Sequence, residues 1–169
     1  MRGVGRQASR RRLLGVVAGG AALAGVGGAA TAAGGGGALT GTWLGSLLRE
    51  NPPPGFPPVR FVFTFGKDGA LSASGPPVLV ENGVTLNINA GHGSWRSAGT
   101  GSFLLDFTSA AYDEAGVFRN AVVTLITLTL GADGVSWSGL YRREDQTADG
   151  TVIRTVGGTV SAVSVPGTA

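Results

Sequence analysis

Three runs of sequence decide the fold of this chain: VFRNAVVTLITLTL at residues 117–130, VSWSGLYRRED at 135–145 and TVIRTVGGTVSA at 151–162. The turn sequences ADG and TADG stand between them. Long β-branched or alternating runs joined by Asp-Gly turns are typical of antiparallel strands connected by tight hairpins. We therefore expect these residues to form a meander of three long strands.

Segments of the same kind precede this meander. They read ALTGTWLGSLL, VRFVFTFG, ALSAS, GHGSWRSAG and SFLLDFTSAAY, at residues 38–48, 59–66, 70–74, 91–99 and 102–112. Eight antiparallel strands without covering helices would expose two long edges, and closure of the sheet removes both. The sequence therefore predicts an all-β fold, an eight-stranded antiparallel up-and-down barrel, with a two-sheet sandwich as the alternative.

Two segments interrupt the strand pattern. NPPPGFPP at residues 51–58 is too rich in proline for a regular strand, so we expect a stiff loop over one end of the barrel. VLVENGVTLNI at residues 78–88 is either a small hairpin about Asn82-Gly83 or an irregular excursion.

The N-terminal residues have the layout of an export signal. A basic stretch ending in SRRRLL at 9–14 is followed by an uncharged run rich in Gly and Ala, and then by Ala30-Thr31-Ala32. SRRRLL resembles the twin-arginine consensus, which implies export of the folded protein by that pathway. The sequence predicts a signal peptide at 1–32, disordered or helical, a Gly-rich linker at 33–38 and a barrel domain at 39–169.

That signal would make the twin-arginine machinery and a signal peptidase the partners of the chain, and the mature protein would be periplasmic or extracellular. A spanning helix needs about 20 predominantly apolar residues. The glycines at positions 15, 19, 20 and 25 weaken the apolar run, so we expect no stable membrane anchor.

Charge and composition exclude several classes of protein. Five of the 13 Lys and Arg residues precede residue 37, so the remaining 8 face 10 Asp and Glu and the mature domain is mildly acidic. Nucleic-acid binding needs a cationic surface, and we exclude it. The chain has no Cys and one His, so we expect no disulfide, metal or cofactor. DQTADG at 145–150 begins like a calcium loop, but Val156 stands where the closing Glu belongs.

Gly41-Thr42-Trp43 resembles the Gly-x-Trp motif that opens lipocalins and other calycins, and Gly93-Ser94-Trp95 repeats it, as in small secreted bacterial barrels. The resemblance implies a calycin-like barrel. In lipocalins the first Trp lies at the closed end, under an Arg from the final strand, and Trp43 can take that place. The chain departs from the pattern at the Arg, because Arg154 lies about half a strand away from the expected position.

One face of the predicted strands carries most of the aromatic side chains. At period two they point into the lumen together, where they either fill the core or line a ligand pocket. With Arg154, the candidate ligand-binding residues are Phe61, Phe63, Phe65, Trp95, Phe103, Phe107, Trp137 and Tyr141.

Arg154 interrupts an otherwise apolar face formed by Val152, Val156, Gly158, Val160 and Ala162. A buried guanidinium needs a partner, because a lone buried charge costs several kcal/mol. Asp106 and Glu144 are the candidate partners, and a bound carboxylate or enolate is a third acceptor. The alternative is that Arg154 reaches solvent at a barrel end.

His92, Ser94 and Asp106 suggest a Ser-His-Asp arrangement, but the nucleophile elbow G-x-S-x-G is absent and side chains two apart on a strand are too distant for a direct hydrogen bond. We interpret His92 as a residue that borders a turn and Asp106 as a solvated residue that points outward. We expect a protein that binds a small apolar or amphipathic molecule in its lumen rather than an enzyme. The alternatives are an enzyme that resembles allene oxide cyclases and catalyses cyclisation or isomerisation, and a filled structural or interaction barrel without a ligand.

Overall fold

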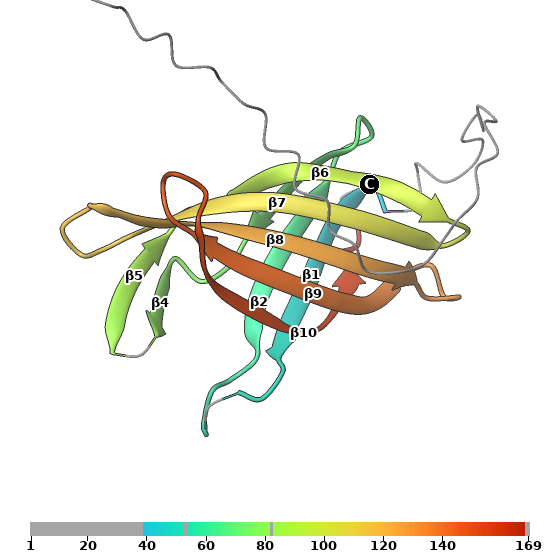
Figure 1. Cartoon of the computed structure of the whole chain (residues 1–169). Coiled ribbons are helices and arrows are strands. Elements are labelled where there is room, and N and C mark those ends of the chain that lie inside the picture. Colours follow the sequence, from blue (N-terminus) through green and yellow to red (C-terminus); the bar gives the residue numbers. More distant parts are fainter. Residues whose placement is uncertain (1–38, 53, 82, 168–169) are drawn as a thin grey trace, which may run out of the picture. The chain divides into compact units, whose positions relative to one another are not determined.

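The structure is a computed structural model that describes residues 39–52, 54–81 and 83–167. The predicted signal peptide at 1–32 and linker at 33–38 lie outside the described residues. Within them the chain forms ten strands and no helix (Figure 1). The strands are β1 Gly41–Arg49, β2 Val59–Phe65, β3 Ala70–Ser74, β4 Val78–Glu81, β5 Val84–Ile88, β6 Gly91–Gly99, β7 Ser102–Tyr112, β8 Phe118–Leu130, β9 Ser136–Gln146 and β10 Val152–Ser164.

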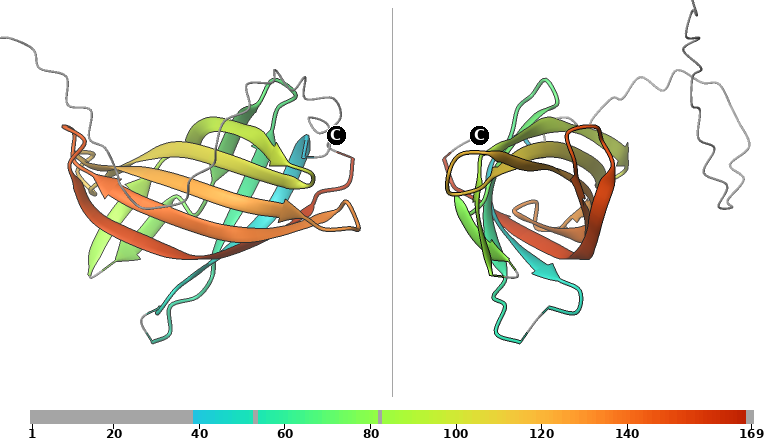
Figure 2. Two further views of the ribbon diagram at one scale, coloured as in Figure 1. Left: turned by 45° about the vertical axis from the view of Figure 1, so that its right-hand side comes forward. Right: turned by 60° about the vertical axis from the view of Figure 1, so that its left-hand side comes forward.

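Eight of these strands close into an antiparallel barrel in the order β7-β6-β3-β2-β1-β10-β9-β8, with β8 pairing back to β7. β1 pairs with the C-terminal half of β10, from Trp43 opposite Ser164 to Arg49 opposite Gly158. Figure 2 shows the closed ring of strands in its right-hand view. The predicted all-β barrel is confirmed, and the two-sheet sandwich is wrong.

The ambiguous segment at residues 78–88 is a hairpin, β4 and β5, as one of the two alternatives had it. It lies outside the ring of eight strands and joins the sheet through β5, where Asn87 pairs with Tyr112 and Ile88 with Ala111 of β7. The amide of Ile88 also donates to the carbonyl of Pro77 at 2.8 Å. The hairpin therefore adds two short strands beside the C-terminal end of β7.

The turns between the long strands form because Asp side chains bind the backbone amides that each turn leaves without a strand partner. Asp133 accepts hydrogen bonds from the amides of Val135 and Ser136, both at 3.0 Å, and from the hydroxyl of Ser136 at 2.7 Å. Gly134 follows at φ +67°, a conformation that favours glycine. These contacts fix the register of the β8–β9 hairpin.

The inward faces of the strands fill one end of the barrel with aromatic rings. Phe63 lies in the middle of this core, 5.4 Å from Trp137 and 6.3 Å from Phe107 between ring centroids. Trp43 packs 6.4 Å from Trp137 and donates its Nε1 proton to the carbonyl of Leu39 at 2.8 Å. Trp43 thus lies at the filled end, while Arg154 enters β10 at the opposite end.

Candidate ligand-binding site

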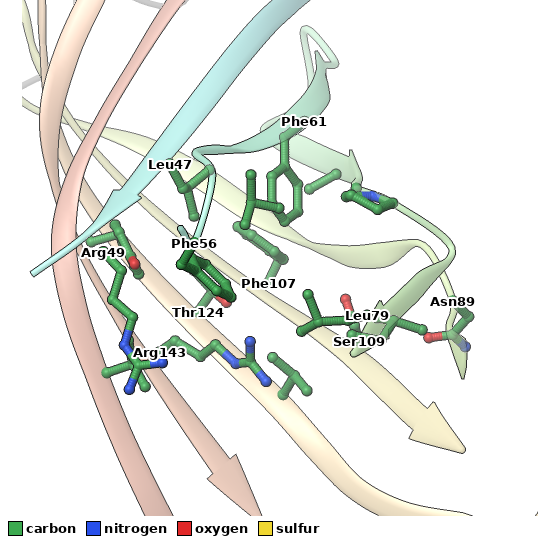
Figure 3. Close-up of a pocket in the computed structure, with 18 residues that line it drawn as sticks. Leu47, Arg49, Phe56, Phe61, Leu79, Asn89, Phe107, Ser109, Thr124 and Arg143 are labelled. Carbon is green, nitrogen blue, oxygen red and sulfur yellow. The ribbon is translucent and has the colours of Figure 1, made fainter. Parts of the chain in front are cut away.

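A partly enclosed cavity of about 80 Å³ lies at the barrel end opposite Trp43. The barrel strands supply most of its wall, and the Pro-rich segment and the β4–β5 hairpin cover it through Phe56 and Leu79 (Figure 3). The loop predicted for this segment therefore lies over this end through Phe56. The apolar lining is formed by Leu47, Phe56, Val59, Phe61, Ala73, Gly75, Pro76, Leu79, Ile88, Phe107, Val122 and Val156.

The polar lining is rich in hydrogen-bond donors. It comprises Arg49, Asn89, Ser109, Thr124, Tyr141 and Arg143, and it includes no Asp or Glu. Thr124 and Arg143 are cross-strand partners on β8 and β9, so their inward side chains lie beside each other. The side chains lining this end therefore carry positive charge and neutral polar groups against an apolar wall.

A buried ion cluster stands behind this lining. Asp145 is only 4% exposed, and its carboxylate accepts from Arg143 Nε at 2.8 Å and from Arg154 Nε at 2.6 Å. Arg143 and Asp145 are two residues apart on β9, and Arg154 on β10 is the cross-strand partner of Asp145. One carboxylate thus contacts two guanidinium groups inside the barrel.

Both partners predicted for Arg154 are wrong. Glu144 is one residue from Asp145, so it points to the outer face, where it forms an ion pair with Arg142 at 2.6 Å. Asp106 also points outward. The sequence pattern did not reveal a bulge in β10, where Ile153 has no partner on β9. Because of this bulge, Val152 points outward and pairs with Gln146. Arg154 remains on the inner face and pairs with Asp145.

The structure divides the predicted lumen residues into three groups. Phe61, Phe107 and Tyr141 line the cavity, whereas Arg154 lies behind it at Asp145. The others belong to the filled core: Phe63, Phe65, Trp95, Phe103 and Trp137. All these side chains face inward as the period-two pattern predicts.

Sequence reasoning missed Arg49 and Arg143 as residues of this site. The signal was present in the alternation of their strands, since Arg49 continues the inward series of Trp43 and Leu47. Arg143 continues the series of Trp137 and Tyr141 in the same way. Arg142 and Arg143 look alike as a doublet, but only the second points inward.

The Ser-His-Asp arrangement does not form, as the spacing argument indicated. Ser94 hydrogen-bonds directly to both carboxylate oxygens of Asp106, at 3.1 and 3.2 Å, on the exposed outer face of β6 and β7. His92 is exposed on the same face, and within the described ranges no hydrogen bond joins it to either residue. The pair is a cross-strand surface contact.

The calcium-like sequence DQTADG forms the β9–β10 turn. Asp145 points to the two arginines, while the Asp149 carboxylate accepts from the Thr147 hydroxyl and from the amide of Thr151. In the part of the chain that the structure describes, no three His, Asp or Glu side chains are grouped to hold a metal ion. No helix among the same residues has the length and apolar character to cross a membrane.

Comparisons with protein-family models, with curated proteins and with solved structures found no match to this chain. The assignment of the fold therefore stands on the geometry of the chain itself. That geometry is an eight-stranded antiparallel β-barrel, consistent with a calycin-like fold.

Proposed function

We propose that this protein is an exported barrel that binds a small amphipathic molecule at the open end of its lumen. The cavity carries the proposal, because it combines apolar walls from Leu47, Phe61 and Phe107 with a few polar groups. Apolar surfaces supply binding free energy through burial, and a small number of placed polar groups orient the ligand.

The size of the cavity limits the ligand. Sites for drug-sized molecules measure about 300–1,000 Å³, and this cavity measures about 80 Å³. The aromatic core around Phe63 and Trp137 blocks further entry into the barrel. We propose a ligand whose buried part is a single ring or a short chain.

Export is supported by the sequence of the N-terminal residues. SRRRLL at 9–14, the uncharged Gly and Ala run and Ala30-Thr31-Ala32 fit a twin-arginine signal cleaved before Ala33. The folded barrel would then meet its ligand outside the cytoplasm. A lipocalin-like role as an extracellular or periplasmic carrier follows from this combination.

An isomerase or cyclase is the second candidate. Tyr141 and Arg143 both line the cavity, so a proton donor and a cation face any bound molecule. To distinguish a carrier from an enzyme, a small molecule that binds the protein is recovered and identified. Its mass and NMR spectrum are then compared before and after incubation with the protein. Unchanged ligand supports the carrier, and a rearranged isomer supports the enzyme.

Neutral probes test the binding proposal without assuming a charged head group. Saturation-transfer NMR and calorimetry with benzyl alcohol and 1-hexanol should detect binding to the mature protein. Leu47 and Leu48 offer a matched pair, because Leu47 lines the cavity and is 8% exposed whereas Leu48 points outward and is 47% exposed.

We expect Leu47→Phe to fill part of the cavity and to weaken binding about tenfold, the effect of about 1.4 kcal/mol. Leu48→Phe should bind as the parent protein does. The proposal fails if neither probe binds, or if both variants bind with the parent affinity while circular dichroism shows that they are folded.

A further inference from the structure

The charge of the cavity indicates which ligands it favours, given the function proposed above. Arg49 and Arg143 line it, and no carboxylate does. The buried acid behind them, Asp145, already contacts both Arg143 and Arg154. An anionic group entering the cavity would meet two guanidinium-bearing side chains and no carboxylate of the lining, so its charge would be stabilised.

The guanidinium of Arg143 is held in place by the barrel. Its Nε donates to Asp145 at 2.8 Å, and the side chain is 18% exposed. Figure 3 shows Arg49 and Arg143 on the same side of the cavity, away from Phe61. Guanidinium groups bind carboxylates through pairs of parallel hydrogen bonds, and a preorganised group loses little entropy in doing so.

Two buried hydroxyl groups add neutral donors to the same site. Thr124 and Ser109 line the cavity at 4% and 8% exposure. Both side chains lie beside other polar groups of the lining, since Thr124 is the cross-strand partner of Arg143. A polar group of a ligand in the cavity can therefore accept hydrogen bonds from these hydroxyls.

Apolar side chains adjoin these donors, since Phe107 is the cross-strand partner of Thr124 and Val122 is that of Ser109. Phe61 and Phe107 present rings, and Leu47 and Val122 present branched side chains. We infer that the ligand is a small organic carboxylate whose acid group lies between Arg49, Arg143 and Thr124 and whose ring or short chain packs against Phe61 and Phe107. This inference rests on the proposed function and names the chemical class of its ligand.

Benzoate and benzyl alcohol test it, because they share a ring and differ in charge. We expect benzoate to bind the mature protein at least about tenfold more tightly than benzyl alcohol, since charge-assisted hydrogen bonds are about twice as strong as neutral ones. Arg143→Gln and Arg49→Gln should each remove that preference, measured as the ratio of the benzoate and benzyl alcohol affinities within the same variant. Arg143→Lys should restore part of it.

Arg142→Gln is the matched control, since Arg142 is adjacent to Arg143, points outward and pairs with Glu144. It should keep the full preference for benzoate. If Arg143→Gln does not fold, the Arg49→Gln variant decides the outcome by itself. Equal affinity for the two probes would overturn the carboxylate inference and leave the proposed function intact, whereas a loss of binding by both probes would overturn the two together.

Discussion

Arg154 on β10 donates its Nε proton to Asp145 on β9 at 2.6 Å, directly across the two strands. Arg143 donates to the other oxygen of the same carboxylate at 2.8 Å. All three side chains point inward, at the barrel end that contains the cavity. Aromatic packing stabilises the filled end of the barrel, and a buried ion cluster stabilises the end that contains the cavity.

Removal of the shared carboxylate should destabilise the protein. Asp145→Asn leaves two inward guanidinium groups facing each other without a charge between them. Breaking one side of a buried ion pair costs about 3 kcal/mol or more, and we expect a loss near that value in urea unfolding. Asp106→Asn is the control, because Asp106 is exposed and its carboxylate contacts the exposed Ser94, and it should change stability by less than about 0.5 kcal/mol.

Two adjacent glycines should respond differently to alanine. A Cβ at Gly158 would overlap the carbonyl oxygen of Leu48 and stand 2.9 Å from Tyr141 Cε1, whereas a Cβ at Gly157 would meet nothing closer than 3.5 Å. We expect Gly158→Ala to cost about 2 kcal/mol, because the β1–β10 ladder must shift to admit it. Gly157→Ala should stay within about 1 kcal/mol of the parent. Thermal unfolding checks both, and equal stabilities would contradict the close approach of β1 to Gly158.

Substitution of the two buried tryptophans Trp43 and Trp137 should show how much the Trp43 hydrogen bond adds to stability beyond packing. Both are 2% exposed. Trp43 donates to the carbonyl of Leu39, while Trp137 Nε1 is buried and makes no hydrogen bond to the residues that the structure describes. Trp43→Phe should therefore cost about 1 kcal/mol more than Trp137→Phe in urea unfolding. Equal losses would show that the bond to Leu39 adds no stability.

The turn carboxylates predict how stability depends on pH. Hydrogen bonds from the Ser136 hydroxyl and then from the amide of Val135 lower the pKa of Asp133 below its usual 3.8. The bond from the Val117 amide lowers the pKa of Asp113, and the bond from the Thr147 hydroxyl lowers that of Asp149.

A carboxylate whose pKa is lower in the folded state stabilises the protein above its unfolded pKa, and that contribution is lost as the pH falls through the folded value. We therefore expect the urea midpoint to be flat near neutral pH and to fall below about pH 4. Asp133→Asn should make the fall shallower. A midpoint that rises on acidification would contradict these hydrogen bonds.

Export should depend on the arginine pair itself and not on its charge. Twin-arginine signals are read as a motif, so Arg10→Lys with Arg11→Lys should leave the precursor in the cytoplasm of a bacterial host. Arg2→Lys with Arg6→Lys is the control and should leave export unchanged. Cell fractionation with detection of the cleaved form measures both, and unaffected export of the first variant would exclude the twin-arginine route.

The sequence alone predicted the strands and the closure of the barrel. Alternation in VRFVFTF and SFLLDFT, with Asp-Gly turns between runs, assigns inward and outward faces, because adjacent side chains on a strand point to opposite sides. The same rule places Arg49 and Arg143 on inner faces, although it does not say which inner residues border open space. The hairpin at 78–88 remained one of two alternatives, because its short strands carry little pattern.

Only the tertiary structure decided where the barrel is filled and which charges meet. The stagger between strands that are far apart in sequence determines whether aromatic rings fill the lumen. In this barrel the stagger packs Phe63 against Trp137 and leaves a cavity beside Phe61. The partner of Arg154 depends on a one-residue bulge in β10, which the alternation of side chains does not reveal. Local pattern determines the face of a residue, whereas register and stagger are set by pairing along the whole ladder.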